Sequence, residues 1–452
     1  MADCGREYIV TAEKMLFSTE ALARIEGFPV FVENACPEDV IRIKITKKNK
    51  NYAKAELVEV KTPSKFRVKP FCPLANVCGS CSWQHISYDE QLRQKQNIVK
   101  ETLKKIAGID VDVPETIPSP VQTEYRCKIQ YPLQQTKVSK RILAGYYKKN
   151  SHELVNIKFC PVHSDIINKI TEFFRTRAAD FEVYSEKTHK GLLRHIVFKY
   201  SKVNNEMLIV LCVNDDKVSL NLKALCEDIY NTFSEVKGVC VNFNTMHNNV
   251  IMSDKTKTVA GQGFYYEQIG DKKFKISANS FFQVNPYTAQ KIFEYVKNEI
   301  KKRVSEPTVL DAYSGVSTFG IMLSDVAKEV VCVEEVKHAV EDAKENVVLN
   351  GCKNVEVIGN DAGKEFDRFQ REGKQFDVVL VDPPRKGCSE ESIQNVVRSA
   401  KKFIVYVSCD VSTLARDMKY ILNNGFKLLS VQPFDMFPNT YHIENVVLMV
   451  RE

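Results

Sequence analysis

The stretch PTVLDAYSGVSTFGIMLSDVA, residues 307–327, combines a short apolar strand pattern, a turn that contains glycine, and a helical pattern. The same succession recurs in EVVCVEEVKHAVEDAKENVVLNG (329–351) and in FDVVLVDPPRKGCSEESIQNVVRSAKK (376–402). Regular alternation of strand and helix predicts a doubly wound, largely parallel α/β sheet from about residue 266 onward. Ligands of such sheets bind at the carboxyl ends of the strands.

Three side chains are expected at that edge of the predicted sheet. Asp382 ends one strand, and Cys409 ends the next, FIVYVSC (403–409). The last strand, HIENVVLMV (442–450), carries Glu444 near its start. If this strand is antiparallel, as a hairpin from the preceding strand requires, it begins at the edge where the parallel strands end. Asp382, Cys409 and Glu444 are therefore predicted to share one rim.

Cys409 lies between this strand pattern and the helical pattern DVSTLARDMKYIL (410–422). A single cysteine is more often a buried structural thiol than a reactive one. The alternative is a nucleophile whose pKa is lowered by the N-terminus of the following helix. The two carboxylates expected nearby favour the nucleophile.

The turn DAYSGVSTFG (311–320) is a candidate for binding a nucleoside cofactor. Gly315 lets the backbone approach a ligand, and a helix N-terminus follows it. Glu334 ends the next strand about twenty residues later, where an acidic residue suits ribose hydroxyls. The alternative is a solvated carboxylate beside Glu335, and the turn alone is a weak signal.

The chain has 452 residues, which is more than one core usually serves. Residues 1–62 show short alternating strands that predict a small β-barrel. Residues 63–265 have a mixed pattern that includes one amphipathic helix, YDEQLRQKQNIVKETLKKIAG (88–108). Residues 266–452 form the α/β region. We therefore expect three domains.

The net charge of +7 is unevenly distributed. Residues 41–70 contain ten Lys and Arg against two Glu. This run is either a solvated face or a track for nucleic-acid phosphates. No apolar run reaches the length of a membrane helix, and the N-terminus lacks a signal-peptide pattern, so we expect a cytoplasmic protein without membrane contact.

Four of the fourteen cysteines form a separate pattern. CPLANVCGSC contains Cys72, Cys78 and Cys81, and Cys160 follows far downstream in FCPVH. Three close thiols and one distant thiol suit a tetrahedral zinc site or an iron–sulfur cluster. The spacing does not choose between the two metals, and chance clustering is the alternative to both.

Taken together, the motifs resemble one family along nearly the whole chain. SFFQVNP (280–286), DAYSGVSTFG, VEEVKHAVEDAKENVVLNG, VDPPRKG, YVSCDVSTLARD and HIENVVLM match in order and spacing the RNA uracil-C5 methyltransferases, which make 5-methyluridine with S-adenosylmethionine. The N-terminal region resembles the TRAM module, an RNA-binding barrel of the oligonucleotide-binding type. The resemblance thus implies a Rossmann-like methyltransferase domain behind a TRAM-like barrel, with RNA as partner.

The resemblance also implies roles for individual residues. Cys409 would add to C6 of a flipped uracil, and Glu444 would be the general base that removes the C5 proton. Asp382 would lie at the uracil edge and belongs with the implied cofactor-binding set. The members of that set are Gln283, Tyr313, Gly315, Glu334, Asp361 and Asp382. In this family a G-x-G sequence is usual in the turn, whereas Ser317 stands here at the second glycine.

A subgroup of the family that includes ribosomal RNA enzymes carries a [4Fe–4S] cluster at places matching Cys72, Cys78, Cys81 and Cys160. The resemblance therefore implies 23S ribosomal RNA as the substrate. We also expect a monomer. Transfer RNA is the alternative substrate, although its dedicated enzymes usually lack both the cluster and the barrel. A further alternative, prompted by Ser317, is an RNA-binding protein with a degenerate cofactor site.

Overall fold

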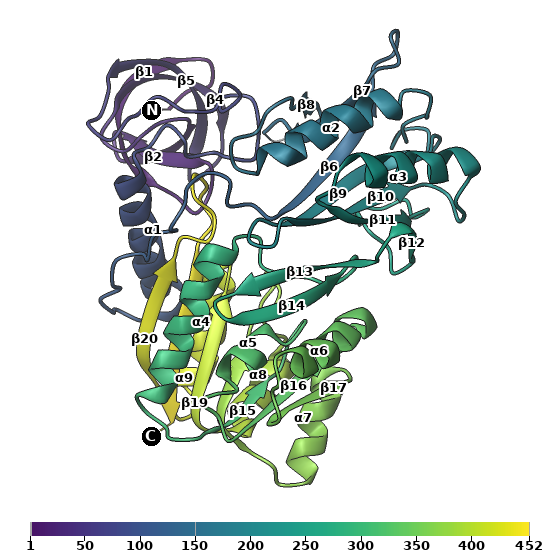
Figure 1. Cartoon of the computed structure of the whole chain (residues 1–452). Coiled ribbons are helices and arrows are strands. Elements are labelled where there is room, and N and C mark those ends of the chain that lie inside the picture. The colour runs from purple at the N-terminus through teal and green to yellow at the C-terminus, as the bar shows by residue number, and fades with distance from the viewer. Residues whose placement is uncertain (1, 150, 452) are drawn as a thin grey trace.

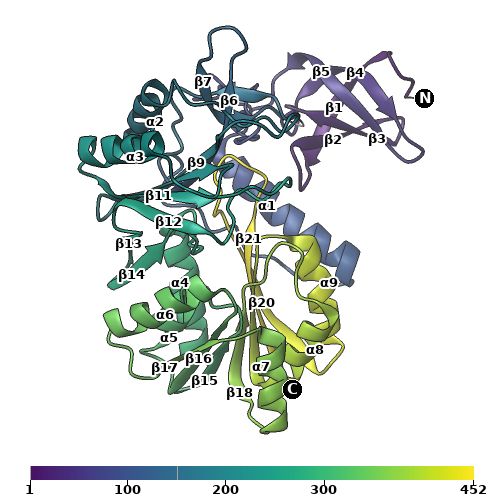
Figure 2. The ribbon, with the colours of Figure 1, turned by 90° about the vertical axis from the view of Figure 1, so that its right-hand side faces the viewer.

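The computed structural model describes residues 2–149 and 151–451, and Figures 1 and 2 show its three parts. The N-terminal part is a closed five-stranded barrel with strand order β1-β2-β3-β5-β4. Ile41, Ile43 and Ile45 are buried while Arg42 and Lys44 point outward, as the alternating sequence predicts. The barrel strands are β1 (Glu7–Met15), β2 (Glu20–Ile25), β3 (Phe28–Glu33), β4 (Val40–Lys48) and β5 (Ala53–Thr62).

The central part is a seven-stranded sheet with the order β12-β11-β10-β9-β6-β7-β8. Helices α2 (Asp165–Arg177) and α3 (Leu220–Thr232) pack on it (Figure 1). A separate hairpin, β13 (Phe264–Ile269) and β14 (Lys272–Ser277), leads to the C-terminal part and crosses the boundary expected at 265/266. The sheet strands are β6 (Lys128–Gln135), β7 (Ile142–Tyr147), β8 (Leu154–Asn156), β9 (Leu193–Ser201), β10 (Glu206–Val213), β11 (Val236–Phe243) and β12 (Thr256–Gly261).

The C-terminal part is a seven-stranded sheet with the order β17-β16-β15-β18-β19-β21-β20. The first five strands along the chain are parallel, and β21 lies antiparallel between β19 and β20, which confirms the predicted doubly wound fold. β18 is almost entirely buried, because helices cover both faces of a parallel sheet. The strands are β15 (Thr308–Asp311), β16 (Glu329–Glu334), β17 (Val355–Gly359), β18 (Phe376–Val381), β19 (Ala400–Ser408), β20 (Phe426–Phe434) and β21 (Glu444–Arg451).

Helix α4 precedes the first strand of this sheet, and helices α5 to α9 follow β15 to β19 in the expected alternation. They are α4 (Pro286–Lys301), α5 (Thr318–Leu323), α6 (Lys337–Leu349), α7 (Ala362–Arg371), α8 (Glu390–Ser399) and α9 (Val411–Leu422). The strand order reverses between β15 and β18, whose neighbours lie on opposite sides. That reversal opens a crevice at the carboxyl ends of β15 and β18, which is where ligands of such sheets bind.

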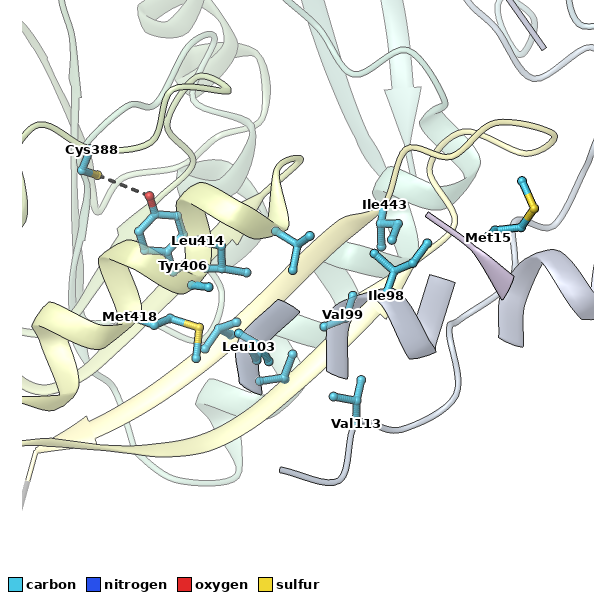
Figure 3. Close-up of a cluster of buried hydrophobic side chains, with 14 of the residues drawn as sticks. Met15, Ile98, Val99, Leu103, Val113, Cys388, Tyr406, Leu414, Met418 and Ile443 are labelled. Atoms are coloured by element: carbon cyan, nitrogen blue, oxygen red, sulfur yellow. Dashed lines mark hydrogen bonds between the residues drawn. The ribbon is translucent and has the colours of Figure 1, made fainter. Parts of the chain in front are cut away.

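The predicted amphipathic helix is present as α1 (Tyr88–Thr102), which continues into a π-helical turn, η1 (Leu103–Ala107). Its apolar face packs into the core of the C-terminal sheet, where Ile98, Val99 and Leu103 cluster with Leu414 and Met418 of α9 (Figure 3). The sequence pattern placed this helix in the 63–265 region. The helix nevertheless packs in the hydrophobic core of the α/β part, against α9, whose residues lie more than 300 positions further along the chain.

A buried ion pair also fixes α1. Lys95 and Asp435, both fully buried, are joined at 2.6 Å, and Lys95 also donates to the Phe437 carbonyl at 3.2 Å. Asp435 follows β20 and precedes the loop that leads to β21. This contact therefore holds the segment that follows β20 against α1. Within the part of the chain that the structure describes, no helix is long and apolar enough to cross a membrane.

Candidate active site

Three side chains from different strands meet at the carboxyl edge of the C-terminal sheet. Asp382 directly follows β18, and Cys409 directly follows β19. Ser408 pairs with Asn445 in the antiparallel β19–β21 ladder, so Glu444, the first residue of β21, lies opposite Cys409. The structure thus brings together the three residues that the predicted strand order placed on one rim.

The Cys409 thiol is a weak acid in this site. Burial raises the pKa of Cys409 to about 12, and the charges of Glu444 and Asp382 act in the same direction. The guanidinium of Arg385 opposes them and lowers the pKa. The expectation that a helix N-terminus lowers the pKa of Cys409 is therefore wrong.

The N-terminus of α9 is already capped by a side chain of its own. Asp410 caps the helix, because its carboxylate accepts hydrogen bonds from the backbone N–H groups of Ser412 at 2.9 Å and Thr413 at 3.1 Å. A carboxylate thus occupies the amides that would have favoured a thiolate. The sequence contained this signal, since Asp410 stands at the preferred cap position.

Buried carboxyl groups gather beside the thiol. Glu444 is 6% exposed, and burial together with the neighbouring Asp382 raises its pKa well above the ordinary value. Burial also raises the pKa of Asp382 to about 7. Asp311, at the end of β15, has no hydrogen-bond partner for either carboxylate oxygen among the described residues. Its pKa is raised to about 8, first by burial and then by Asp382. Near neutral pH, these three carboxyl groups therefore carry protons that an exposed aspartate or glutamate would have lost.

A pocket of about 230 Å³ lies at the ends of β15, β16 and β17. Tyr313, Glu334 and Asp361, three residues that the sequence pattern assigned to cofactor binding, all line it. Asp361 also caps α7, since its side chain accepts a hydrogen bond from the Lys364 N–H at 3.0 Å. An aromatic ring and two carboxylates around one cavity fit a nucleoside with ribose hydroxyls as donors.

Glu334 shapes the turn beside this pocket. One carboxylate oxygen accepts from the Gly315 N–H at 2.9 Å, and the other accepts from the Val336 N–H at 2.8 Å. Gly315 has φ +55°, and Ser317 has φ +60° with its side chain completely buried. Ser317, which stands where the resembling family usually has glycine, thus adopts a left-handed φ, which strains any residue with a Cβ.

Gln283 lies outside that pocket but close to the rim. Its side-chain amide donates to Asp382 Oδ2 at 3.4 Å. Its backbone carbonyl accepts from the Cys127 thiol at 3.1 Å, which ties the segment before α4 to the start of β6. Gln283 therefore connects the central part of the molecule with the carboxyl edge of the sheet.

The four patterned cysteines also come together. Cys72, Cys78, Cys81 and Cys160 line one small pocket with a cavity volume of about 20 Å³. Apolar side chains line the rest of it, among them Leu74, Ile157 and Val162. Within residues 2–149 and 151–451, no three His, Cys, Asp or Glu side chains stand close enough to form a metal site. Four thiols facing one apolar cavity are nevertheless a donor set that suits a metal–sulfur group.

The basic run of residues 41–70 is partly neutralised in the folded barrel. Acidic residues from other strands and loops pair with it, as in the contacts of Arg42 with Glu7 and of Lys54 with Glu20. The residues of the run that form ion pairs are Arg42, Lys48, Lys54, Lys61 and Arg67. A phosphate track on the barrel would thus rest on the remaining exposed lysines, such as Lys44 and Lys47.

Two residues of the site were missed by the sequence reasoning. Arg385 stands in VDPPRKG and supplies the positive charge that faces Cys409, Glu444 and His442. Asp311 stands in the cofactor turn and is completely buried. Both residues lie in motifs that the sequence analysis singled out, so membership of those motifs could have marked them as candidate site residues. Their roles depend on distances to other strands, which the motifs do not contain.

Comparison with known proteins assigns this geometry to a family. Residues 87–452 match the family described as tRNA (Uracil-5-)-methyltransferase, and residues 5–58 match the TRAM domain. The chain is 36% identical over 447 residues to an RNA methyltransferase of Bacillus cereus, covering 98% of this chain and 96% of that one. It is 35% identical over 449 residues to an RNA methyltransferase of Caldanaerobacter subterraneus, covering 99% and 98% of the two chains.

A solved structure is similar over the same length. The Pyrococcus abyssi tRNA (uracil-54, C5)-methyltransferase in complex with S-adenosyl-L-homocysteine aligns with a TM-score of 0.76 and 25% identity. The alignment covers 98% of this chain and 100% of that chain. The resemblance seen in the motifs is therefore confirmed at the level of family, barrel and methyltransferase fold.

Proposed function

Because the chain belongs to the tRNA (uracil-5-)-methyltransferase family and is an S-adenosylmethionine-dependent RNA methyltransferase, we propose that it methylates C5 of a uridine through a covalent adduct with Cys409. The observation that carries this proposal is the placement of Glu444 opposite Cys409 across the β19–β21 ladder. A nucleophile and a general base on one edge suit covalent catalysis that ends in proton removal.

The proposed reaction consists of an addition, a methyl transfer, a proton removal and an elimination. The Cys409 thiol gives its proton to solvent and Sγ adds to C6 of the uracil, which makes C5 nucleophilic; C5 then takes the methyl group of S-adenosylmethionine, which leaves as S-adenosylhomocysteine. Glu444 removes the proton from C5. The electron pair of that C–H bond re-forms the C5–C6 double bond, and the Cys409 thiolate leaves. The uracil must be flipped out of its stack to reach Cys409.

The protonation states of Cys409 and Glu444 affect the addition to C6 and the removal of the C5 proton. With a pKa of about 12, Cys409 is a thiol at neutral pH, so the proposal requires it to ionise when the substrate arrives. The charge of Arg385 favours the thiolate. Asp382 and Glu444 are two close carboxyls with raised pKa values, so they retain a proton between them near neutral pH. Glu444 must lose that proton before it can act as the base.

The cofactor site is proposed on the residues that line the 230 Å³ pocket together with those at its rim. Tyr313 would pack on the nucleoside, and Glu334 and Asp361 would accept from its hydroxyl and amino groups. Gly315 would admit the backbone close to the ligand. Gln283 and Asp382, joined at 3.4 Å, would face the part of the cofactor nearest to Cys409.

The proposed substrate is 23S ribosomal RNA, supported by the four-cysteine pocket that the motif resemblance connects with ribosomal RNA enzymes. Transfer RNA is the second candidate, favoured by the similarity to the Pyrococcus abyssi enzyme. That similarity spans the barrel, so the barrel does not distinguish the two RNA classes as the sequence reasoning assumed. A methylation assay on both RNA classes therefore distinguishes ribosomal RNA from transfer RNA as the substrate.

One assay tests the reaction and the substrate together. The protein is incubated with labelled S-adenosylmethionine and, separately, with unmodified 23S ribosomal RNA and unmodified transfer RNA, and the labelled nucleoside is identified. We expect 5-methyluridine in the ribosomal RNA. Label only in transfer RNA would select the second candidate, and label on an amino group of adenine or cytosine would overturn the proposed chemistry.

A second proposal concerns the four-cysteine pocket, where Cys72, Cys78, Cys81 and Cys160 would hold a [4Fe–4S] cluster in a structural or RNA-orienting role. Methyl transfer moves no net electrons, so no redox step is needed. Anaerobically purified protein should contain iron and sulfide and show a broad visible absorption that oxygen bleaches. Stoichiometric zinc without iron would contradict this proposal.

A further inference from the structure

The motifs VDPPRKG and YVSCDVSTLARD each contain residues that the proposed chemistry does not use, and these residues contact one another. Asp417, in the middle of α9, is 3% exposed. Its Oδ2 accepts hydrogen bonds from the Tyr406 hydroxyl at 2.6 Å and from the Cys388 N–H at 3.0 Å. One carboxylate thus joins β19, α9 and the loop that follows β18.

Other contacts of α9 hold the same loop. Arg416 donates to Asp417 Oδ1 at 2.7 Å and to the carbonyls of Lys386 at 3.1 Å and Cys388 at 3.0 Å. Thr413 donates to the Arg385 carbonyl at 3.2 Å. Residues 385–388 are therefore hydrogen-bonded to α9 along two turns. We call this set of contacts the α9 clamp.

Gly387 is part of the α9 clamp because there is no room for a side chain. A Cβ at Gly387 would lie 2.6 Å from Arg416 Nη2 and 2.7 Å from Asp417 Oδ2. Its φ of +73° also disfavours any other residue. Figure 3 shows the hydroxyl of Tyr406 directed at the Cys388 thiol, 3.7 Å away, and Tyr406 is completely buried.

The α9 clamp connects the two ends of the site. The loop carries Asp382 and Arg385, and α9 begins two residues after Cys409. We propose that Asp417 is a positioning residue of the active site, which sets the location of Arg385 and Asp382 relative to Cys409 by holding residues 385–388 on α9. The inference rests on the proposed role of Cys409 for its functional meaning. The geometric claim can be tested without turnover.

The test measures the local charge at Cys409 by alkylation. Anionic iodoacetate and neutral iodoacetamide have similar size, so the ratio of their rate constants at Cys409 reports the nearby positive charge and cancels changes in accessibility. The rate constants are obtained by mass spectrometry of the Cys409 peptide at about pH 9. Arg385→Gln provides the reference for loss of that charge.

We expect Asp417→Asn to lower the iodoacetate-to-iodoacetamide ratio by about two-fold or more, in the same direction as Arg385→Gln. Combining Asp417→Asn with Arg385→Gln should lower the ratio little further, because both changes act through one charge. Tyr406→Phe, which removes only the hydroxyl that contacts Asp417 and Cys388, should have a smaller effect in the same direction. It also serves if Asp417→Asn fails to fold.

Asp39→Asn is the matched control, because Asp39 is a completely buried carboxylate with backbone and arginine partners in the barrel. It should leave the ratio unchanged. An unchanged ratio in folded Asp417→Asn and Tyr406→Phe would overturn the inference. If wild-type protein forms no adduct with 5-fluorouridine RNA, the proposed function fails, and the alkylation ratio still decides whether the α9 clamp positions Arg385.

Discussion

Two buried carboxylates, one in the barrel part and one in the α/β part, differ in whether the protein supplies them with hydrogen-bond partners. Asp39 accepts hydrogen bonds from the backbone N–H groups of Cys36 at 2.7 Å and Ser64 at 2.8 Å and pairs with Arg67. Asp311 has no hydrogen-bond partner among the described residues, and its pKa is raised to about 8. Asp39 is thus satisfied within the fold, whereas Asp311, at the carboxyl edge of the sheet, is left without partners.

The same contrast separates the cysteines. Three of them, Cys212, Cys240 and Cys332, lie buried in strands and act as small apolar side chains. Cys409 is partly exposed and faces carboxylates and an arginine. The predictions below test whether the difference between satisfied and unsatisfied groups corresponds to a difference between structure and function.

The largest effect is expected at Cys409. Cys409→Ala should reduce methyl transfer by about 10⁴-fold or more, because covalent activation of C6 is lost. It should also abolish the adduct with 5-fluorouridine RNA, measured as a slow band in denaturing gels. Cys352→Ala is the control, since Cys352 is also partly exposed but contacts Ser324. Turnover by Cys409→Ala close to wild type would exclude the covalent mechanism.

Glu444→Gln should have the next largest effect. Turnover should fall by about 10²–10⁴-fold, since proton transfer by a positioned group contributes that much. Cys409 remains, so methylated RNA should accumulate as a covalent complex, which labelled S-adenosylmethionine detects on the protein band. A slow variant without any accumulated complex would argue that Glu444 acts before methyl transfer.

Asp39 and Asp311 should respond in opposite ways to neutralisation. Asp39→Asn leaves Arg67 without its charged partner and should destabilise the protein by about 3 kcal/mol. Asp311→Asn removes an unpaired buried acid and should stabilise the protein above neutral pH. Thermal unfolding of both variants, followed by calorimetry at about pH 5 and pH 8.5, tests this pair.

The pH dependence at Asp311 has a defined sign. The pKa of Asp311 is about 8 in the folded protein, against 3.8 for an aspartate that is not buried. Between pH 3.8 and pH 8, Asp311 therefore keeps its proton in the folded state and loses it in the unfolded state. Stability therefore falls as pH rises from 4 to 8, by at most about 5 kcal/mol for this group. The fall should be smaller in Asp311→Asn. An equal fall in both proteins would contradict a protonated Asp311.

The smallest effect is expected at Ser317. Its φ of +60° costs about 1 kcal/mol in a residue with a Cβ. Ser317→Gly should therefore raise the unfolding temperature slightly and tighten binding of S-adenosylhomocysteine up to about fivefold, measured by calorimetry. Ser314→Gly, in the same turn, is the control. Weaker binding by Ser317→Gly would mean that the buried hydroxyl itself serves the ligand.

The sequence by itself determined the α/β alternation, the barrel, and the rim on which Asp382, Cys409 and Glu444 meet. These follow from local periodicity and strand order, because successive strands and helices allow few connections. Tyr313, Glu334 and Asp361 were likewise found in motifs that fold into one pocket.

Only the tertiary structure decided which groups are charged, paired or held in place. The raised pKa of Cys409 comes from burial and from Glu444, and four cations of the 41–70 run pair with acids on other strands and loops. The packing of α1 against α9 and the contacts of Asp417 also join segments far apart in the chain. Burial and pairing depend on such distant contacts, which no local pattern contains.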